Sequence, residues 1–257
     1  MSRSAASGTF VATETHEGTK AEPRRLRRAP LLEGCRLWPD SYDKPNPLHT
    51  LEERVLLPHV PALRGKVVLD VACGTGQWLR KLLGRGARAG FGVDLSPEML
   101  AQAARNSLAG RLVRADCGAL PLQSQTADVI ICSLAIGHLP EPGKLAKELA
   151  RTARPGADVY LSNFRPAAHA RGWQRTFRHG DELVEAPSCA HSLDSVRREF
   201  ESAGFQVVHC EEPHLGEPEG PIFAWRGKAD FLAAASETPA LYVFHVRARQ
   251  RLRLEVA

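Results

Sequence analysis

Three aspartates stand at or near the ends of short apolar segments that have the composition of β-strands. Asp70 lies near the end of Val67–Val71, and Asp94 and Asp116 follow the next two such segments. The carboxyl ends of neighbouring parallel strands meet at one edge of a sheet, where α/β folds bind ligands. Carboxylates at that edge accept hydrogen bonds from hydroxyl and amino groups. The spacing therefore predicts one ligand crevice lined by acids, rather than three unrelated surface residues.

A glycine-containing turn follows the first of these segments. Gly74 and Gly76 would let a ligand approach the backbone, and the helix that follows would offer free N–H groups. A dinucleotide site favours a third small residue where this chain has Leu79. Asp70 would repel a pyrophosphate but attract an ammonium or sulfonium group. The turn therefore favours a zwitterionic, net cationic nucleoside over NAD, with an unliganded tight turn as the alternative.

Strands and helices are expected to alternate from Lys66 onwards. The helices are expected to begin near Gly76, Pro97, Lys144, Leu193 and Ala229. The expected strands are Val67–Val71, Ala89–Val93, Arg111–Ala115, Asp128–Cys132, Asp158–Leu161, Phe205–Val208 and Leu241–Val246. Such alternation predicts an α/β fold with a mostly parallel sheet covered by helices on both faces.

Four segments in this order resemble the motifs of class I methyltransferases, most closely those of ubiquinone and menaquinone biosynthesis. They are Asp70–Gly76, Val93–Met99, Ala115–Pro121 and the run ending in His138-Leu139-Pro140. The resemblance covers residues 66–164 well and the remainder in outline; Ala72 stands where many members have glycine. It implies a Rossmann-like, doubly wound, seven-stranded sheet with a reversed last strand. It also implies S-adenosylmethionine as cofactor and S-adenosylhomocysteine as product.

The resemblance further implies which residues bind each part of the cofactor. The first turn would surround the methionine moiety, and Asp94 would accept hydrogen bonds from the ribose. Leu95 or Met99 would contact the adenine, and Asp116 with the backbone of Cys117 would bind its edge. The complete set of expected cofactor-binding residues is Asp70, Ala72, Gly74, Gly76, Asp94, Leu95, Met99, Asp116, Cys117 and Ser133.

Residues outside these motifs are expected to bind the small-molecule acceptor. His138 follows the fourth strand and is the candidate general base, which an acceptor hydroxyl or carbon acid would need. A structural or substrate-packing histidine is the alternative. Tyr42 precedes the first strand, and Trp173 and Arg175 lie in a later insert. Aromatic walls with a guanidinium suit a planar or carboxylated substrate, although an amphipathic hairpin with solvated arginines fits the insert equally well.

We expect the chain to divide into three parts. Residues 1–35 are rich in small, polar and basic residues without periodicity, which predicts a disordered extension. Residues 36–64 carry Pro45, Pro47, Pro58 and Pro61 around the helical pattern Leu48–Leu57, which predicts a short helical cap. Residues 65–257 would form the methyltransferase domain, with a substrate insert near 165–190.

Composition indicates in which cellular compartment the protein is expected. The longest apolar stretch, Val129–Ile136, is interrupted by Ser133 and is shorter than the ~18 residues of a membrane-spanning helix. The first thirty residues lack the apolar block of a secretory signal. The six cysteines form no C-x-x-C pair, so neither a zinc site nor a disulfide framework is expected. A reducing cytoplasm is the predicted location.

Charge and the fourth motif bear on alternative functions. The net charge of +5 arises largely from arginine clusters near both ends, which are more typical of solvated tails than of a nucleic-acid surface. Cys132–His138 lacks the Asn/Asp-Pro-Pro-aromatic signature of many methyltransferases that act on amino groups of nucleic acids and proteins. A nucleic-acid or protein methyltransferase and a non-catalytic, cofactor-binding regulatory module stay as alternatives. The acceptor, the methylated atom and the oligomeric state are not predicted.

Overall fold

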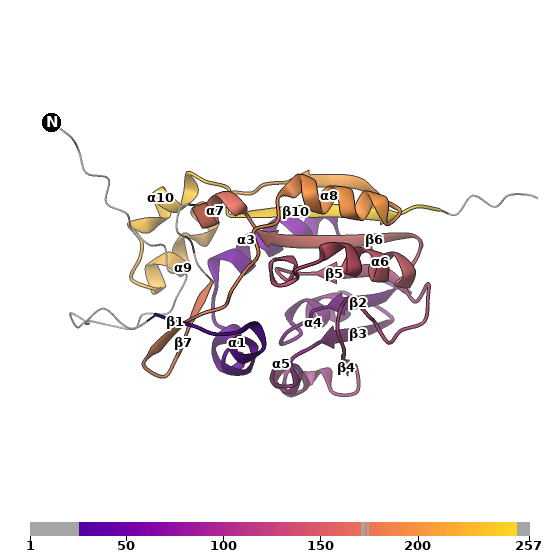
Figure 1. Ribbon diagram of the computed structural model, residues 1–257, viewed down its shortest axis with the longest axis horizontal. Coiled ribbons are helices and arrows are strands. Elements are labelled where there is room, and N and C mark those ends of the chain that lie inside the picture. The colour runs from indigo at the N-terminus through magenta and orange to yellow at the C-terminus, as the bar shows by residue number, and fades with distance from the viewer. Residues whose placement is uncertain (1–25, 171–172, 174, 251–257) are drawn as a thin grey trace, which may run out of the picture.

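The computed structural model describes residues 26–170, 173 and 175–250, which contain a seven-stranded sheet and a smaller three-stranded sheet (Figure 1). The strands of the large sheet follow the spatial order β4-β3-β2-β5-β6-β10-β9. They are β2 (Val67–Val71), β3 (Ala89–Asp94), β4 (Leu112–Arg114), β5 (Ala127–Cys132), β6 (Ala153–Phe164), β9 (Phe205–Glu211) and β10 (Leu241–Ala248). Only β10 runs antiparallel to its neighbours in this sheet. The predicted Rossmann-like fold with a reversed last strand is therefore confirmed.

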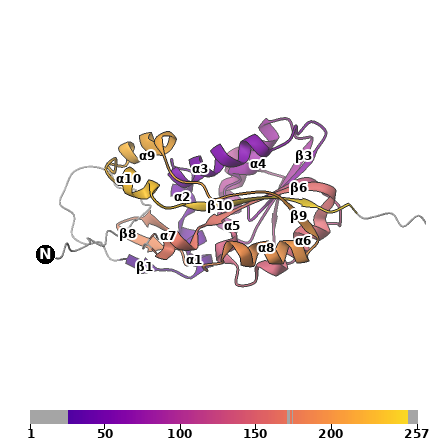
Figure 2. The same cartoon turned by 90° about the horizontal axis from the view of Figure 1, so that it is seen from above.

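Helices cover both faces of the large sheet, as Figure 2 shows for α3 and α4 on one side and α6 and α8 on the other. Two buried apolar clusters lie on these faces: Leu51, Trp78 and Leu79 belong to one, and Leu145 and Phe200 to the other. The helices of the large domain are α4 (Gln77–Gly84), α5 (Pro97–Ala103), α6 (Pro142–Thr152), α7 (Pro166–Ala170), α8 (Leu193–Ser202), α9 (Gly220–Trp225) and α10 (Phe231–Ser236). Among the described residues, no helix has both the length and the apolar composition needed to cross a membrane.

The helices before the large sheet are α1 (Leu31–Leu37), α2 (Pro39–Tyr42) and α3 (Pro47–Leu56). The side chain of Asn46 accepts a hydrogen bond from the backbone N–H of Leu48 at 2.9 Å and so caps the start of α3. Leu48, Leu51 and Val55 occupy one face of α3 and are buried in the core. This periodicity is the reason that the helix was predictable.

The expectation of disorder up to residue 35 is wrong for residues 26–35. There, β1 (Leu26–Arg28) pairs in parallel with β8 (Glu182–Glu185), and β8 pairs antiparallel with β7 (Thr176–His179). The arginines that suggest a solvated tail have partners on the hairpin, since Arg27 pairs with Glu182 at 3.0 Å and Arg28 with Glu185 at 2.7 Å. The remainder of the predicted extension, residues 1–25, lies outside the described residues.

The turn from β2 into α4 requires glycine at position 76. Gly76 has φ +78°, and an added Cβ would overlap the side chain of Leu108. By contrast, Gly84 at the other end of α4 is exposed, and a Cβ there would have no neighbour within 4 Å. The two glycines of this helix therefore have different physical roles.

We predict that Gly76→Ala lowers the free energy of unfolding by about 2–4 kcal/mol, because left-handed strain and overpacking add together. Gly84→Ala is the matched control and should raise stability by up to about 1 kcal/mol, since alanine favours a helix over glycine. Urea unfolding of both variants and the wild type measures the difference. Equal effects of the two substitutions would contradict this account of the turn.

Candidate functional site

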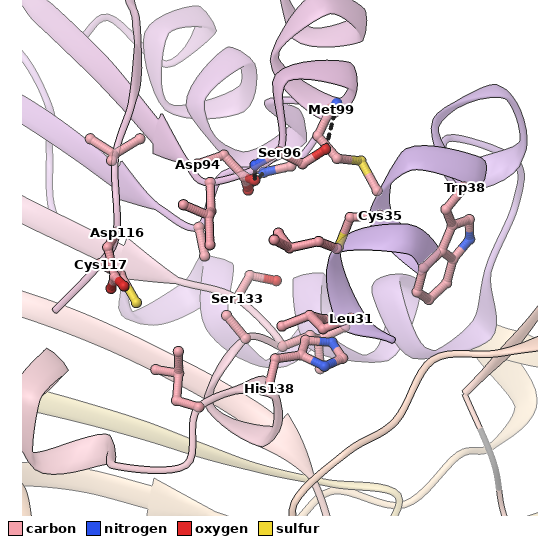
Figure 3. A pocket seen from close by; sticks show the side chains of 18 of the residues that line it. Leu31, Cys35, Trp38, Asp94, Ser96, Met99, Asp116, Cys117, Ser133 and His138 are labelled. Atoms are coloured by element: carbon pink, nitrogen blue, oxygen red, sulfur yellow. Dashed lines mark hydrogen bonds between the residues drawn. The ribbon is translucent and has the colours of Figure 1, made fainter. Parts of the chain in front are cut away.

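A cavity of about 310 Å³ lies at the carboxyl edge of the large sheet (Figure 3). The turn after β2 and the segments that follow β3, β4 and β5 form one part of its lining. The predicted site residues that line it are Tyr42, Ala72, Gly74, Asp94, Leu95, Met99, Asp116, Cys117, Ser133, His138 and Arg175. Parallel strand ends thus bring together most of the residues that the motifs indicate.

Asp94 is held in place at the end of β3 by two backbone N–H groups. Its Oδ2 accepts from Gly74 N at 2.7 Å, and its Oδ1 accepts from Ser96 N at 2.8 Å. Burial raises the pKa of this carboxyl group above its ordinary value, while these hydrogen bonds oppose the shift. Each carboxylate oxygen can accept more than one hydrogen bond, so both stay able to accept from a ligand.

Asp70 and Gly76 belong to the predicted set but do not line the main cavity. Gly76 begins α4 and shapes the turn, as described above. Asp70 is 1% exposed, and its Oδ2 accepts from Leu79 N at 2.9 Å inside the first turn of α4. Asp70 instead lines a smaller inner pocket. Tyr42 and Ser133 line both this pocket and the main cavity.

The inner pocket contains a buried acid that motif analysis missed. Glu52 on α3 accepts from Trp78 Nε1 at 3.1 Å, from Ser133 Oγ at 2.8 Å and, at shorter distance, from Ser162 Oγ. Burial raises the pKa of Glu52 despite these three donors. The sequence does contain a signal for Glu52. It is an acidic residue on the apolar face of α3, directly after Leu51, where a charged side chain is unusual.

His138 has hydrogen bonds at both ring nitrogens. Its Nε2 lies 2.7 Å from Nη1 of Arg175, and its Nδ1 lies 3.0 Å from the carbonyl oxygen of Pro187. A guanidinium only donates, so Nε2 accepts and Nδ1 carries the hydrogen. Burial, followed by the charge of Arg175, lowers the pKa of His138 to about 3. The ring is therefore neutral, and its one basic nitrogen is occupied.

Arg175 reaches the cavity from the segment before β7. Its Nη1 also donates to the carbonyl oxygen of Leu134 at 2.7 Å, and its guanidinium carbon lies 5.6 Å from the ring centre of Trp38. Burial lowers the pKa of Arg175 below its ordinary range. Among the described residues, no carboxylate forms an ion pair with it.

The structure places Trp173 away from the cavity wall, which differs from the acceptor role predicted for it. Trp173 is 5% exposed and belongs to the apolar core, where its ring centre lies 6.1 Å from that of Phe164. The backbone N–H of Trp173 donates to the carbonyl oxygen of Ala168 in α7. The large apolar ring is buried in the core. Among the described residues of this insert, Arg175 is the one that lines the cavity.

Helix α1 and Trp38, which follows it, form a further wall of the cavity. Leu31, Leu32, Cys35 and Trp38 line it, and Figure 3 shows this wall opposite Asp116. The ring of Trp38 stacks on Phe177 of β7 with centres 4.6 Å apart. These four residues have the spacing of one helix face. The polar and basic composition of the preceding segment favoured a disordered extension over a helix.

The sequence analysis predicted no metal site. Within the described part of the chain, one group of possible ligands, His59, His209 and Glu211, brings its donor atoms within 4.8 Å of one another. None of the three lines the cavity. All six cysteines are free thiols.

We predict a pH dependence of stability that originates at Asp70. Burial raises the pKa of Asp70 in the folded protein from 3.8 to about 8. The folded state therefore binds this proton more tightly, and the resulting stabilisation is complete below about pH 4 and is lost as the pH rises through 8. Relative to Asp70→Asn, the wild type should lose up to about 1.4 kcal/mol per pH unit between about pH 5 and 8.

Urea unfolding of both proteins without cofactor, at several pH values in that range, measures this loss. The asparagine keeps an oxygen that can accept from Leu79 N, so the helix contact is retained. Parallel pH profiles for the two proteins would show that Asp70 titrates normally.

Comparison with known proteins shows that this chain is similar to methyltransferases. Residues 68–156 match the family model described as a methyltransferase domain. A ubiquinone biosynthesis O-methyltransferase from Burkholderia orbicola is 33% identical over 238 residues, which cover 89% of this chain and 98% of that protein. A malonyl-[acyl-carrier protein] O-methyltransferase from Enterobacter lignolyticus is 35% identical over 166 residues, or 62% of this chain and 65% of that protein.

Solved structures share the fold. An S-adenosylmethionine-dependent methyltransferase from Mesorhizobium loti has a TM-score of 0.62 and 20% identity, and the match covers 76% of this chain and 97% of that one. A second, from Aquifex aeolicus, has a TM-score of 0.56 and 20% identity, with 81% and 96% covered.

Proposed function

This chain belongs to the class I S-adenosylmethionine-dependent methyltransferases, and we propose that the cavity between the strand ends and α1 is the site of methyl transfer. The protein transfers a methyl group from S-adenosylmethionine to a small-molecule acceptor. One observation carries the location: the carboxylate of Asp94, fixed by two backbone N–H groups, opens into the same cavity as Arg175.

The residues on the strand side of the cavity fit the cofactor. Asp94 would hold the ribose hydroxyls, and Asp116, with Oδ1 already accepting from Gly118 N at 2.7 Å, would bind the adenine edge together with the Cys117 backbone. A side chain at Gly74 would fill the space before the Tyr42 ring, which lies 3.8 Å from the ideal Cβ position. The buried acids of the inner pocket suit the positive charge of the methionine end.

The acceptor would occupy the part of the cavity between α1 and the segment after β5. Leu31, Cys35 and Trp38 give this part apolar walls, and Tyr42 and Arg175 supply polar groups. The sulfonium activates the methyl group when the cofactor is bound, so the chain mainly has to align a nucleophile about 3 Å from it and exclude water. We assign the predicted acceptor role to Tyr42, His138 and Arg175.

We propose that His138 orients Arg175 rather than accepting a proton from the acceptor. Its Nε2 already accepts from Arg175, and the carbonyl of Pro187 fixes the opposite tautomer. A base with a pKa of about 3 is also poorly matched to neutral pH. The general-base role predicted from sequence would require Arg175 to move away first.

The methylated atom is proposed to be oxygen. Two relatives of this chain carry names that specify O-methyl transfer, one in ubiquinone biosynthesis and one on malonyl-[acyl-carrier protein]. We further propose a reducing, cytoplasmic location, which suits six free thiols.

Turnover with isotopically labelled S-adenosylmethionine and a metabolite library tests the function directly. A labelled mass shift in a small molecule supports the proposal and excludes a non-catalytic regulatory module. Labelled RNA, DNA or protein, with no labelled small molecule, would favour the macromolecular alternative instead.

We predict that Asp94→Ala weakens binding of S-adenosylhomocysteine by roughly tenfold or more, because charge-assisted hydrogen bonds to the ribose are lost. Isothermal titration calorimetry measures the affinity. Glu98→Gln is the control, since Glu98 lies nearby at Ser96 Oγ but does not line the cavity. A thermal melt checks folding, because Asp94 also binds Gly74 and Ser96. Unchanged affinity in folded Asp94→Ala would overturn the ribose assignment.

A further inference from the structure

We propose that the acceptor binds as an ionised oxygen acid, a carboxylate or an acidic phenol or enol, and that Arg175 pairs with this oxygen as it is methylated. This inference rests on the proposed function, because it takes the cavity as the acceptor site. It adds the chemical class of the substrate.

Arg175 presents unused hydrogen-bond donors at the cavity. Its hydrogen bonds to described residues, those to Leu134 O and His138 Nε2, both use Nη1. The N–H groups of Nε and Nη2 therefore have no hydrogen-bond partner among the described residues, and they form the fork that matches a carboxylate or another anionic oxygen. Arg175 itself is among the residues that line the cavity.

Arg175 also forms no ion pair with a described carboxylate, although the buried Glu52 attracts its charge from beyond ion-pair distance. The neutral groups around it are a backbone carbonyl, a neutral imidazole and the face of Trp38. A guanidinium removed from water without an anionic partner is destabilising, as the lowered pKa of Arg175 reflects. A ligand that brings a negative charge relieves this cost, whereas a neutral ligand increases it by excluding more water.

The groups around the acceptor space are poor bases. His138 has an occupied nitrogen, and burial raises the pKa of Cys35 to about 11 and that of Tyr42 still higher. A cysteine or tyrosine that stays protonated cannot remove a proton from a neutral hydroxyl near pH 7. An acceptor that arrives already ionised needs no such base.

The chemical step then balances without proton transfer. A lone pair of the acceptor oxygen forms the bond to the methyl carbon, while the carbon–sulfur bond breaks and its electron pair returns to sulfur. An anion and a cation become a neutral methyl ester or ether and S-adenosylhomocysteine without a sulfonium charge. Arg175 attracts the ionised substrate but not the neutral product, which favours product release.

The experiment compares carboxylic acids with their own primary amides, which have nearly the same shape but no charge. Benzoate with benzamide and octanoate with octanamide are the probes, titrated by calorimetry into the wild-type protein saturated with S-adenosylhomocysteine. We expect each acid to bind at least about tenfold more tightly than its amide. Equal or undetectable binding of acids and amides overturns the inference.

Variants of two arginines from the same hairpin region identify the responsible charge. Arg175→Gln should abolish the preference for acids and leave the affinity for S-adenosylhomocysteine within about twofold. Arg178→Gln is the matched control, because Arg178 lies on β7 and does not line the cavity. Should Arg175→Gln fail to fold, the comparison of acids with amides in the wild type still decides the question.

Two other outcomes are distinguishable. Weaker S-adenosylhomocysteine binding by folded Arg175→Gln, with an unchanged preference for acids, would assign Arg175 to the cofactor's carboxylate. It would overturn the inference but leave the proposed function standing. Failure of the wild type to bind the cofactor at all would instead remove the proposed function.

His138→Gln tests the positioning role of His138. It should raise the KM of the preferred acid more than it lowers kcat, without a new pH dependence.

Discussion

The carboxylate of Glu52 joins four segments of the chain whose relative positions shape the cavity. Glu52 comes from α3, and its donors come from α4, from the segment after β5 and from β6. Ser162, one of these donors, also accepts from the backbone N–H of Leu134. Since Leu134 O in turn accepts from Arg175, the acceptor wall depends on this buried acid. Removing one of these partners would leave a buried polar group without a hydrogen bond. This lowers stability more than removing a hydrogen bond of a solvent-exposed group.

The charges around the cavity are separated by sign. Asp70, Glu52 and Asp94 lie on the side of the inner pocket and the strand ends, and Arg175 approaches from the opposite segment. Burial raises the pKa of Asp70 and Glu52, and a cationic donor bound beside them would favour their ionised forms. Arg175 would attract an anionic acceptor from the other side, so binding itself brings the reacting groups together. The reaction neutralises both charges and thereby removes the attraction that held the substrates.

Sequence motifs predicted which residues meet at the strand ends, the side of the cavity that we propose for the cofactor, because each motif is local. Asp94 and Asp116 each follow a short strand, and the parallel register of β3 and β4 places them at one edge without help from distant residues. The wall formed by α1 was not predictable in the same way. Arg27 and Arg28 have the composition of a solvated tail. The segment is ordered by contacts with residues more than 150 positions later, namely the pairing of β1 with β8 and the ion pairs with Glu182 and Glu185.

The acceptor side is built from such distant pairs, which explains why its residues were harder to assign than those for the cofactor. Trp173 and Arg175 are two residues apart and were expected to act together, yet one fills the apolar core and the other lines the cavity. The stacking of Phe177 on Trp38 fixes the hairpin against α1 and so sets the position from which Arg175 enters. Changes in β1, α1 or β7 can therefore alter the acceptor space without touching the cofactor motifs. One mode of cofactor binding is in this way compatible with different acceptors on one fold.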